Sequence, residues 1–176
     1  MIKKLVGFDT VSRESNLPLI DFVQNILDDQ GIDSRRVPSA DGQKSNLIAT
    51  VGPSEAGGVV LSGHTDVVPV DGQDWDSDPF TLMRSGSRLY GRGSCDMKGF
   101  IGIALALVPK MVNLRRPIHF ALSYDEEVGC LGAPDMIEVI RRELPEPQGV
   151  IVGEPTTMGA VIGHKGMVGL RTVVRG

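Results

Sequence analysis

Apolar and polar residues alternate along the chain in blocks that predict helices and strands in turn. Residues 16–30 place leucine, isoleucine and valine side chains at helical spacing, which predicts an amphipathic helix. Asn16 can cap this helix with its side chain, and Gly31 can end it. Short apolar or alternating runs predict strands at residues 32–37, 46–51, 59–62, 117–123, 149–152 and 159–162.

Two further segments have the pattern of helices. Residues 97–112 are strongly apolar and predict a buried helix that Pro109 kinks or breaks. Residues 131–143 predict an amphipathic helix, whose buried side we expect to contain Leu131, Met136, Ile137, Ile140 and Leu144. Residues 70–95 predict little regular structure, and a long glycine-rich connection of this kind is usually functional.

The alternation of strands and helices predicts an α/β fold, a three-layer sandwich around a mostly parallel sheet. In open parallel sheets, ligands bind beyond the carboxyl ends of the strands. Polar residues follow three of the expected strands at that end: His64 and Asp66, then 125–127, then Glu154. We therefore expect the functional site at this edge of the sheet.

Composition narrows the class of protein. The 176 residues carry a net charge of −4, and the basic residues form no patch of the kind that binds nucleic acid. No apolar run approaches the roughly 20 residues that span a bilayer, and the N-terminus lacks the features of a secretory signal. Two cysteines make no disulfide framework, so we expect a cytoplasmic domain in which Cys95 and Cys130 are packed thiols.

A mixed imidazole and carboxylate set makes a metal centre the leading hypothesis for the site. The candidate ligands are His64, Asp96, Glu127 and Glu154. Such a set suits zinc, cobalt or manganese better than calcium, and a bridging carboxylate can hold two ions about 3.5–4 Å apart. Several acids at strand ends also repel one another unless a cation neutralises them.

Glu126 and Glu127 follow one strand together, so one can bind a metal ion while the other holds a proton as a general base. The alternative is an acidic turn on the surface. Residues 91–99 are glycine-rich but lack the Gly-Lys-Ser/Thr of a phosphate loop, so we expect these glycines to let the backbone orient Asp96.

Four ordered motifs resemble those of the dizinc amidohydrolases, the family that includes aminoacylases, carboxypeptidases, desuccinylases and deacetylases of amino acids. They are Ser-Gly-His-Thr-Asp at 62–66, Gly-Arg-Gly to Asp-Met-Lys-Gly at 91–99, Asp-Glu-Glu-Val-Gly at 125–129 and Gly-Glu-Pro-Thr at 153–156. The sequence around the third motif, together with residues 70–73 and 163–166, is most similar to that of the acetylornithine deacetylase branch of the family. The resemblance implies a zinc-exopeptidase-like catalytic domain that hydrolyses N2-acetyl-L-ornithine to L-ornithine and acetate.

The resemblance also implies a role for each matched residue. Two zinc ions, or cobalt, would share Asp96; His64 and Glu154 would bind one ion and Glu127 the other. Asp66 would orient His64. Glu126 would take a proton from the attacking water and pass it to the leaving amine. The family further leads us to expect a cis peptide bond between Asp96 and Met97.

We interpret residues 1–165 as the N-terminal part of the catalytic domain and 166–176 as the start of a lid or dimerisation domain. The family's last histidine ligand lies in a later region, and the full-length family enzyme is expected to be a homodimer. His119 lies in an apolar strand and is a poor replacement, while His164 receives no definite role. On this interpretation, the 176-residue chain alone has little or no deacetylase activity.

Three alternatives remain open. The chain could belong to a succinyl-diaminopimelate desuccinylase or a related carboxypeptidase, with the same chemistry on another small N-acyl amino acid substrate. It could be a non-catalytic, truncated metal-binding fragment. Thiol redox chemistry at Cys95 and Cys130 is the third alternative.

Overall fold

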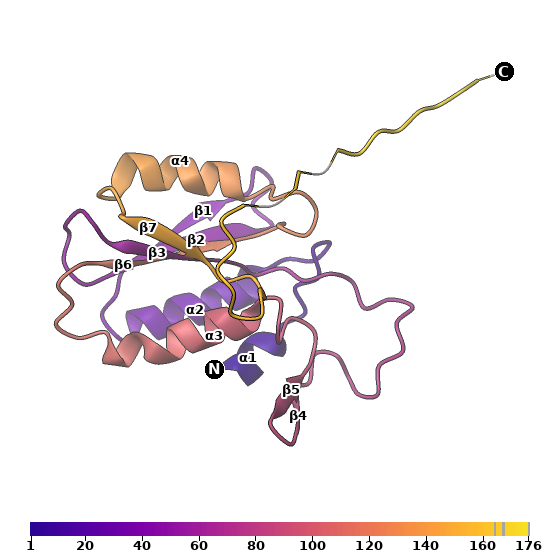
Figure 1. The fold of residues 1–176 in the computed structure, drawn as a ribbon, viewed down its shortest axis with the longest axis horizontal. Coiled ribbons are helices and arrows are strands. Elements are labelled where there is room, and N and C mark those ends of the chain that lie inside the picture. The colour runs from indigo at the N-terminus through magenta and orange to yellow at the C-terminus, as the bar shows by residue number, and fades with distance from the viewer. Residues whose placement is uncertain (164, 167, 176) are drawn as a thin grey trace.

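A five-stranded sheet forms the centre of the protein in the computed structural model, which describes residues 1–163, 165–166 and 168–175. Its strand order is β1-β2-β6-β3-β7 (Figure 1). The strands are β1 (Ser34–Pro38), β2 (Ser45–Val51), β3 (Val59–His64), β6 (Ile118–Ser123) and β7 (Gly149–Val152). Strands β6, β3 and β7 pair in parallel, while β2 pairs antiparallel with both β1 and β6. Only β2 of these strands runs against the others, so the expected mostly parallel sheet is confirmed.

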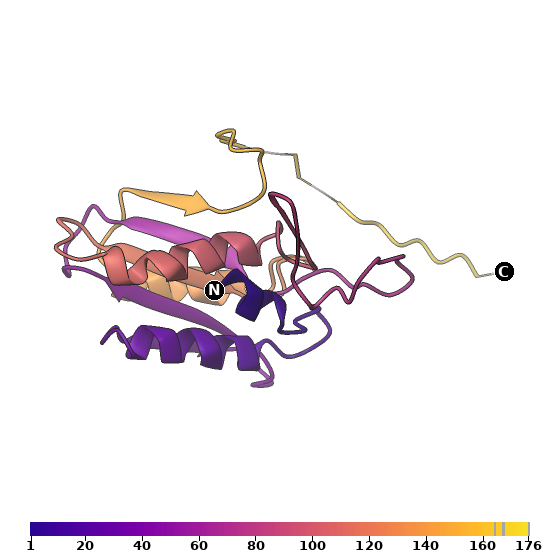
Figure 2. The same ribbon diagram turned by 90° about the horizontal axis from the view of Figure 1, so that it is seen from below.

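Helices cover both faces of the sheet and complete the three layers (Figure 1). On one face lie α1 (Ile2–Val6), α2 (Leu17–Asp28) and α3 (Lys98–Leu107), and on the other lies α4 (Ala133–Glu143). Figure 2 shows β7 at the edge of the sheet, away from α2. The alternation along β2 explains the layers: Leu47 and Ala49 pack with α2 and α3, whereas Ile48 packs with Met136 of α4.

The start of α2 corrects one expectation. Asn16 precedes the helix, but its side chain makes no capping hydrogen bond. It donates instead to the backbone oxygen of Ser45 and to Oγ1 of Thr65, at 2.9 and 2.8 Å. The Ser15 hydroxyl oxygen accepts the Leu17 N–H, so the neighbouring residue satisfies the helix end. Asn16 therefore links the start of β2 to the residue that follows β3 rather than capping a helix.

The long connection before α3 contains more structure than its composition indicated. A hairpin of β4 (Met83–Ser85) and β5 (Arg88–Tyr90) turns at Gly86, whose φ of 59° favours glycine. The break expected at Pro109 is confirmed, because α3 ends at Leu107 and a 3₁₀ turn spans Val108–Lys110.

Two expectations for the C-terminal third are wrong. On α4 the buried side chains are Met136 and Val139, whereas Leu131 and Ile137 are 59% and 50% exposed. The reason is that β7 lies at the sheet edge, so a groove of about 890 Å³ stays open between α4 and β7 beside Ile137. Residues 159–162 form no strand.

Residues 168–175 contain no helix or strand and leave the body of the domain (Figures 1 and 2). The division at residue 165 stays a prediction, and His164 lies outside the described residues. Within the described part of the chain, no helix has the length and apolarity to cross a bilayer.

Candidate metal centre

The parallel strands bring three parts of the chain to one level. The register pairs His64 at the end of β3 with Ser123 at the end of β6. It also pairs Ser62 with Val152 of β7, so Glu154 follows two residues beyond that pair, level with His64. The site is therefore at the carboxyl edge of the sheet, as the sequence predicts.

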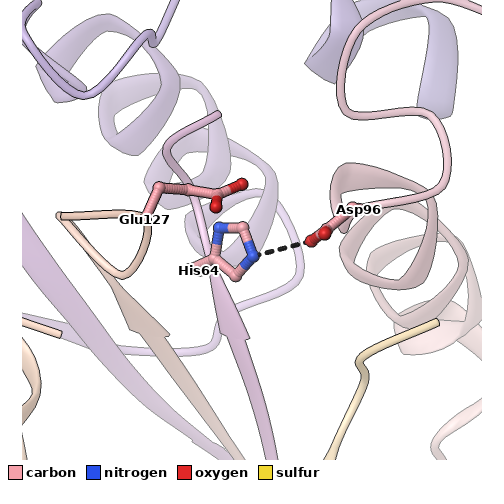
Figure 3. Close-up of side chains that lie close together, drawn as sticks. All are labelled: His64, Asp96 and Glu127. Atoms are coloured by element: carbon pink, nitrogen blue, oxygen red, sulfur yellow. Dashed lines mark hydrogen bonds and ion pairs between the residues drawn. The ribbon is translucent and has the colours of Figure 1, made fainter. Parts of the chain in front are cut away.

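Carboxylates surround the ring of His64. Its Nε2 atom lies 2.9 Å from Oδ1 of Asp96, 3.7 Å from Oε1 of Glu154 and 4.0 Å from Oε2 of Glu126. Ligand atoms of His64, Asp96 and Glu127 all lie within 4.8 Å of one another. Figure 3 shows Asp96 and Glu127 approaching the ring from two different loops. The four candidate ligands thus lie around one point, with Glu154 beside the tighter group of three.

The charges of these groups perturb one another. Burial by itself would lower the pKa of His64, but hydrogen bonds and charge from Asp66, with the hydrogen bond to Asp96, raise it to about 9. Burial raises the pKa values of Glu127 and Glu154, and the charges of Asp96 and Glu126 raise them further. The unneutralised acids therefore repel each other around one imidazolium.

The donor set fits a divalent transition-metal ion. Two donors at about 2.0–2.1 Å from a tetrahedral ion lie roughly 3.3 Å apart. The distances from His64 Nε2 to Asp96 and Glu154, 2.9 and 3.7 Å, bracket that value. A positive ion between these groups would also offset both burial, which is the main cause of the raised pKa values of Glu127 and Glu154, and the repulsion that adds to it.

Asp66 connects the end of β3 to the loop that follows β6. Its Oδ1 accepts the Glu126 N–H at 3.0 Å, and its Oδ2 accepts the Glu127 N–H at 3.2 Å. The Ser12 hydroxyl also donates to Oδ2 at 2.7 Å. Burial raises the pKa of Asp66, but hydrogen bonds from His64, Ser12 and the Glu126 amide lower it below its usual value. This carboxylate thus positions the backbone of both glutamates.

Asp96 reaches the site from a loop that packs tightly under it. The Asp96–Met97 peptide bond is cis, as expected. Lys98 is fully buried, and its ammonium donates to the backbone oxygen of Phe8 at 2.7 Å. A Cβ on Gly93 would lie 2.8 Å from Val67 and 3.0 Å from Lys98, so the glycines of this loop let it wrap around the lysine.

A buried polar framework behind the site escaped the sequence reasoning. Thr10 donates to the backbone oxygen of Thr65 at 2.6 Å, and Thr65 donates to that of Ser123 at 2.8 Å. Asn46 and Ser12 belong to the same framework. The only sequence signal is a set of small polar residues beside apolar runs, which is equally typical of turns.

His119 lies away from the metal centre, and the two cysteines are not packed as expected. His119 is buried near the start of β6, at the opposite end from the site, with Nδ1 2.9 Å from Thr50 Oγ1. The expectation of packed thiols is wrong, since Cys95 and Cys130 are both exposed and free. Cys130 follows a tight turn after β6, which leaves its side chain at the surface, with Sγ 3.8 Å from Glu126 Oε1.

Comparison with known proteins identifies the family. The model of Peptidase family M20/M25/M40 matches residues 60–166, which is more than half of the chain and includes all four motifs. The chain belongs to this family.

Curated relatives include the acetylornithine deacetylase of Myxococcus xanthus, 38% identical over 99% of this chain and 46% of that protein. The acetylornithine deacetylase of Pasteurella multocida is 37% identical over 89% of this chain and 41% of that protein. The chain therefore spans about half the length of the curated relatives it matches.

Solved structures agree on the fold. Human carnosine dipeptidase 1 is 26% identical with a TM-score of 0.67, over 81% of this chain and 34% of that one. The M20 family metallo-carboxypeptidase Sso-CP2 from Sulfolobus solfataricus has a TM-score of 0.74 at 20% identity, over 86% of this chain and 36% of that one. The zinc-exopeptidase-like architecture expected from the sequence is thus supported by M20 structures.

Proposed function

We propose that this chain is part of a metal-dependent amidohydrolase that converts N2-acetyl-L-ornithine and water into L-ornithine and acetate. The observation that carries the proposal is the convergence of His64, Asp96 and Glu127 from three different strand ends and loops. The substrate rests on the names of the curated relatives, which are acetylornithine deacetylases.

The proposed centre would hold two zinc ions, with cobalt as a functional substitute. His64 and Glu154 would hold one ion, Glu127 would hold the other, and Asp96 would supply its carboxylate to both. A solved M20 relative from Bacillus subtilis, described as a dinuclear metal binding peptidase, is consistent with two ions. Bound ions supply Lewis-acid chemistry, which makes a water easier to deprotonate and a carbonyl easier to attack.

The chain's own residues then move the proton. Glu126 accepts a proton from the water whose oxygen bonds to the acetyl carbon, and returns it to the amine nitrogen as the C–N bond breaks. Asp66 keeps Glu126 and Glu127 in place through their amides, over 3.0 and 3.2 Å. The lid, the homodimer and the cytoplasmic location stay predictions of the sequence.

The test measures metal content and hydrolysis, on the 176-residue chain and on the complete product of its gene. Preferred turnover of N2-acetyl-L-ornithine supports the proposal, and preferred turnover of N-succinyl-diaminopimelate supports the desuccinylase instead. Metal uptake without hydrolysis by the complete gene product would favour the non-catalytic alternative. Replacing both cysteines by serine should leave turnover unchanged, which separates metal chemistry from thiol chemistry.

A further inference from the structure

The loop that carries Glu126 and Glu127 closes on itself between Tyr124 and Gly132. The Gly132 N–H donates to the Tyr124 oxygen at 3.2 Å, and the Leu131 N–H donates to the Asp125 oxygen at 3.0 Å. Inside the loop, the amides of Gly129 and Cys130 both donate to the Glu126 oxygen at 3.0 Å. The segment therefore behaves as one closed unit whose orientation depends on how its two ends are held.

One side chain holds both ends. Oδ1 of Asn46 accepts the Tyr124 N–H at 3.3 Å, and Nδ2 of Asn46 donates to the Gly132 oxygen at 2.9 Å. Asn46 is fully buried in β2, beside the last pair of the ladder with β6, Leu47 and Leu122. Its amide thus continues the hydrogen bonding past the point where the strands separate, which buried backbone groups require.

Gly132 is shaped to receive this amide. A Cβ on Gly132 would lie 2.6 Å from Asn46 Oδ1 and 2.8 Å from the Tyr124 oxygen, closer than such atoms approach. A side chain there would therefore separate the asparagine from the loop.

We propose that Asn46 and Gly132 form a positioning clamp that fixes the base of the loop, so that Glu126 and Glu127 face His64. Asp66 holds the part of the loop that carries the two glutamates, through their amides, whereas Asn46 holds the base at Tyr124 and Gly132. The hydrogen bonds of the Asn46 side chain go to Tyr124 and Gly132 at the two ends of the loop, so its effect on the proposed ligands would pass through the loop. The inference rests on the proposed function in that Glu127 binds a metal ion.

The experiment uses three variants of this chain: Asn46→Ala, Gly132→Ala and the control Thr50→Val. Thr50 also lies on β2 and bonds a β6 side chain, His119, but at the end of the strand away from the loop. The readouts are zinc affinity by competition with a chromophoric chelator, hydrogen exchange at the amides of Glu126 and Glu127, and the melting temperature of the metal-free chain.

We expect both clamp variants to bind zinc about 10–100-fold more weakly, the range seen when outer hydrogen-bond partners are lost. The two amides should exchange about tenfold faster or more. Thr50→Val should lower the melting temperature without weakening zinc binding and without speeding exchange at the two amides. If Asn46→Ala does not fold, Gly132→Ala decides alone by the same criteria.

Zinc affinity within about twofold of the parent, with unchanged exchange at both amides, would overturn the clamp. An equal loss of affinity in Thr50→Val would overturn it too, since general destabilisation would then explain the effect. Failure of the parent chain to take up zinc would instead contradict the proposed metal centre, and the exchange rates would still decide the clamp.

Discussion

The Nδ1 atom of His64 lies 2.9 Å from the backbone oxygen of Asp66, whereas Oδ1 of Asp66 is 3.6 Å away. The orientation of the ring is therefore set by a peptide group that no side-chain substitution removes. The Asp66 carboxylate raises the pKa of His64 through hydrogen bonding and charge, and it also accepts hydrogen bonds from Ser12 and from the two glutamate amides.

Replacing Asp66 by Asn removes this charge and should lower the pKa of His64 from about 9 toward its ordinary value near 6.5. Burial opposes protonation of the ring, and Asp66 is the main group that outweighs burial. A histidine NMR titration of the metal-free chain measures the shift. Asp71→Asn, an exposed aspartate nearby, is the control; an unchanged pKa in Asp66→Asn would contradict the assignment.

Metal uptake should release about one proton at His64 near pH 7, because a metal ion requires the neutral imidazole and the metal-free ring titrates at about 9. Because His64 must lose its proton, zinc affinity should rise about tenfold for each pH unit until the pH reaches about 9. Calorimetry in two buffers of different ionisation enthalpy counts the protons. Equal heats in both buffers at pH 7 would rule out a protonated His64 in the metal-free chain.

Glu126→Gln should lower turnover of N2-acetyl-L-ornithine by about 10²–10⁴-fold in the complete gene product, because an amide cannot accept the proton. Zinc content should stay nearly unchanged. The control is Glu138→Gln, an exposed glutamate on α4 outside the site. Loss of zinc together with turnover would make Glu126 a ligand instead of the base.

Gly153→Ala should displace the end of β7 and destabilise the chain by about 1–3 kcal/mol, through overpacking. The added Cβ would lie 2.1 Å from the Phe100 ring, so the ring or the backbone before Glu154 must move. Gly149 begins the same strand with nothing within 4 Å of an added Cβ, so Gly149→Ala is the matched control. Urea unfolding of both variants compares them, and equal stabilities would refute the close packing.

Acid should destabilise the metal-free chain through His119, whose pKa burial lowers below 6.5. The unfolded chain then binds a proton that the folded chain does not, so this contribution is present above pH 6.5 and is lost as the pH falls. The free energy of unfolding should fall more between pH 7.5 and 5.5 in the parent than in His119→Gln. Equal falls would show that His119 is not held neutral.

Helices and strands, which follow from a repeating pattern of side chains, are predicted better from the sequence than features that depend on tertiary contacts. Leucine, isoleucine and valine at helical spacing predicted α2 correctly, and polar residues directly after the expected strands predicted the carboxyl-edge location of His64 and Glu154. The capping role of Asn16 failed because a tertiary partner, Thr65, competes for the same side chain. Ile137 follows the apolar pattern of α4 yet stays exposed, because nothing in the pattern tells where the sheet ends.

The same limit applies to the polar framework behind the site. Asn46, Ser12 and Thr10 find their partners only when segments far apart in sequence meet. A local pattern shows that such residues are polar, but not which backbone groups they satisfy. The need for glycine at position 132 becomes apparent only from the structure, where Asn46 packs against it.

The register of β3 against β6 has a consequence for how the protein is made. A ribosome produces His64 long before Ser123, its partner in the ladder, and before the loop with Glu127. A shift of one residue in that pairing would turn His64 to the opposite face of the sheet. An ion would therefore meet all four candidate donors only after β6 and β7 have emerged and found their correct alignment, because Glu127 follows β6 and Glu154 follows β7. Metal capture would then report that these strands have assembled.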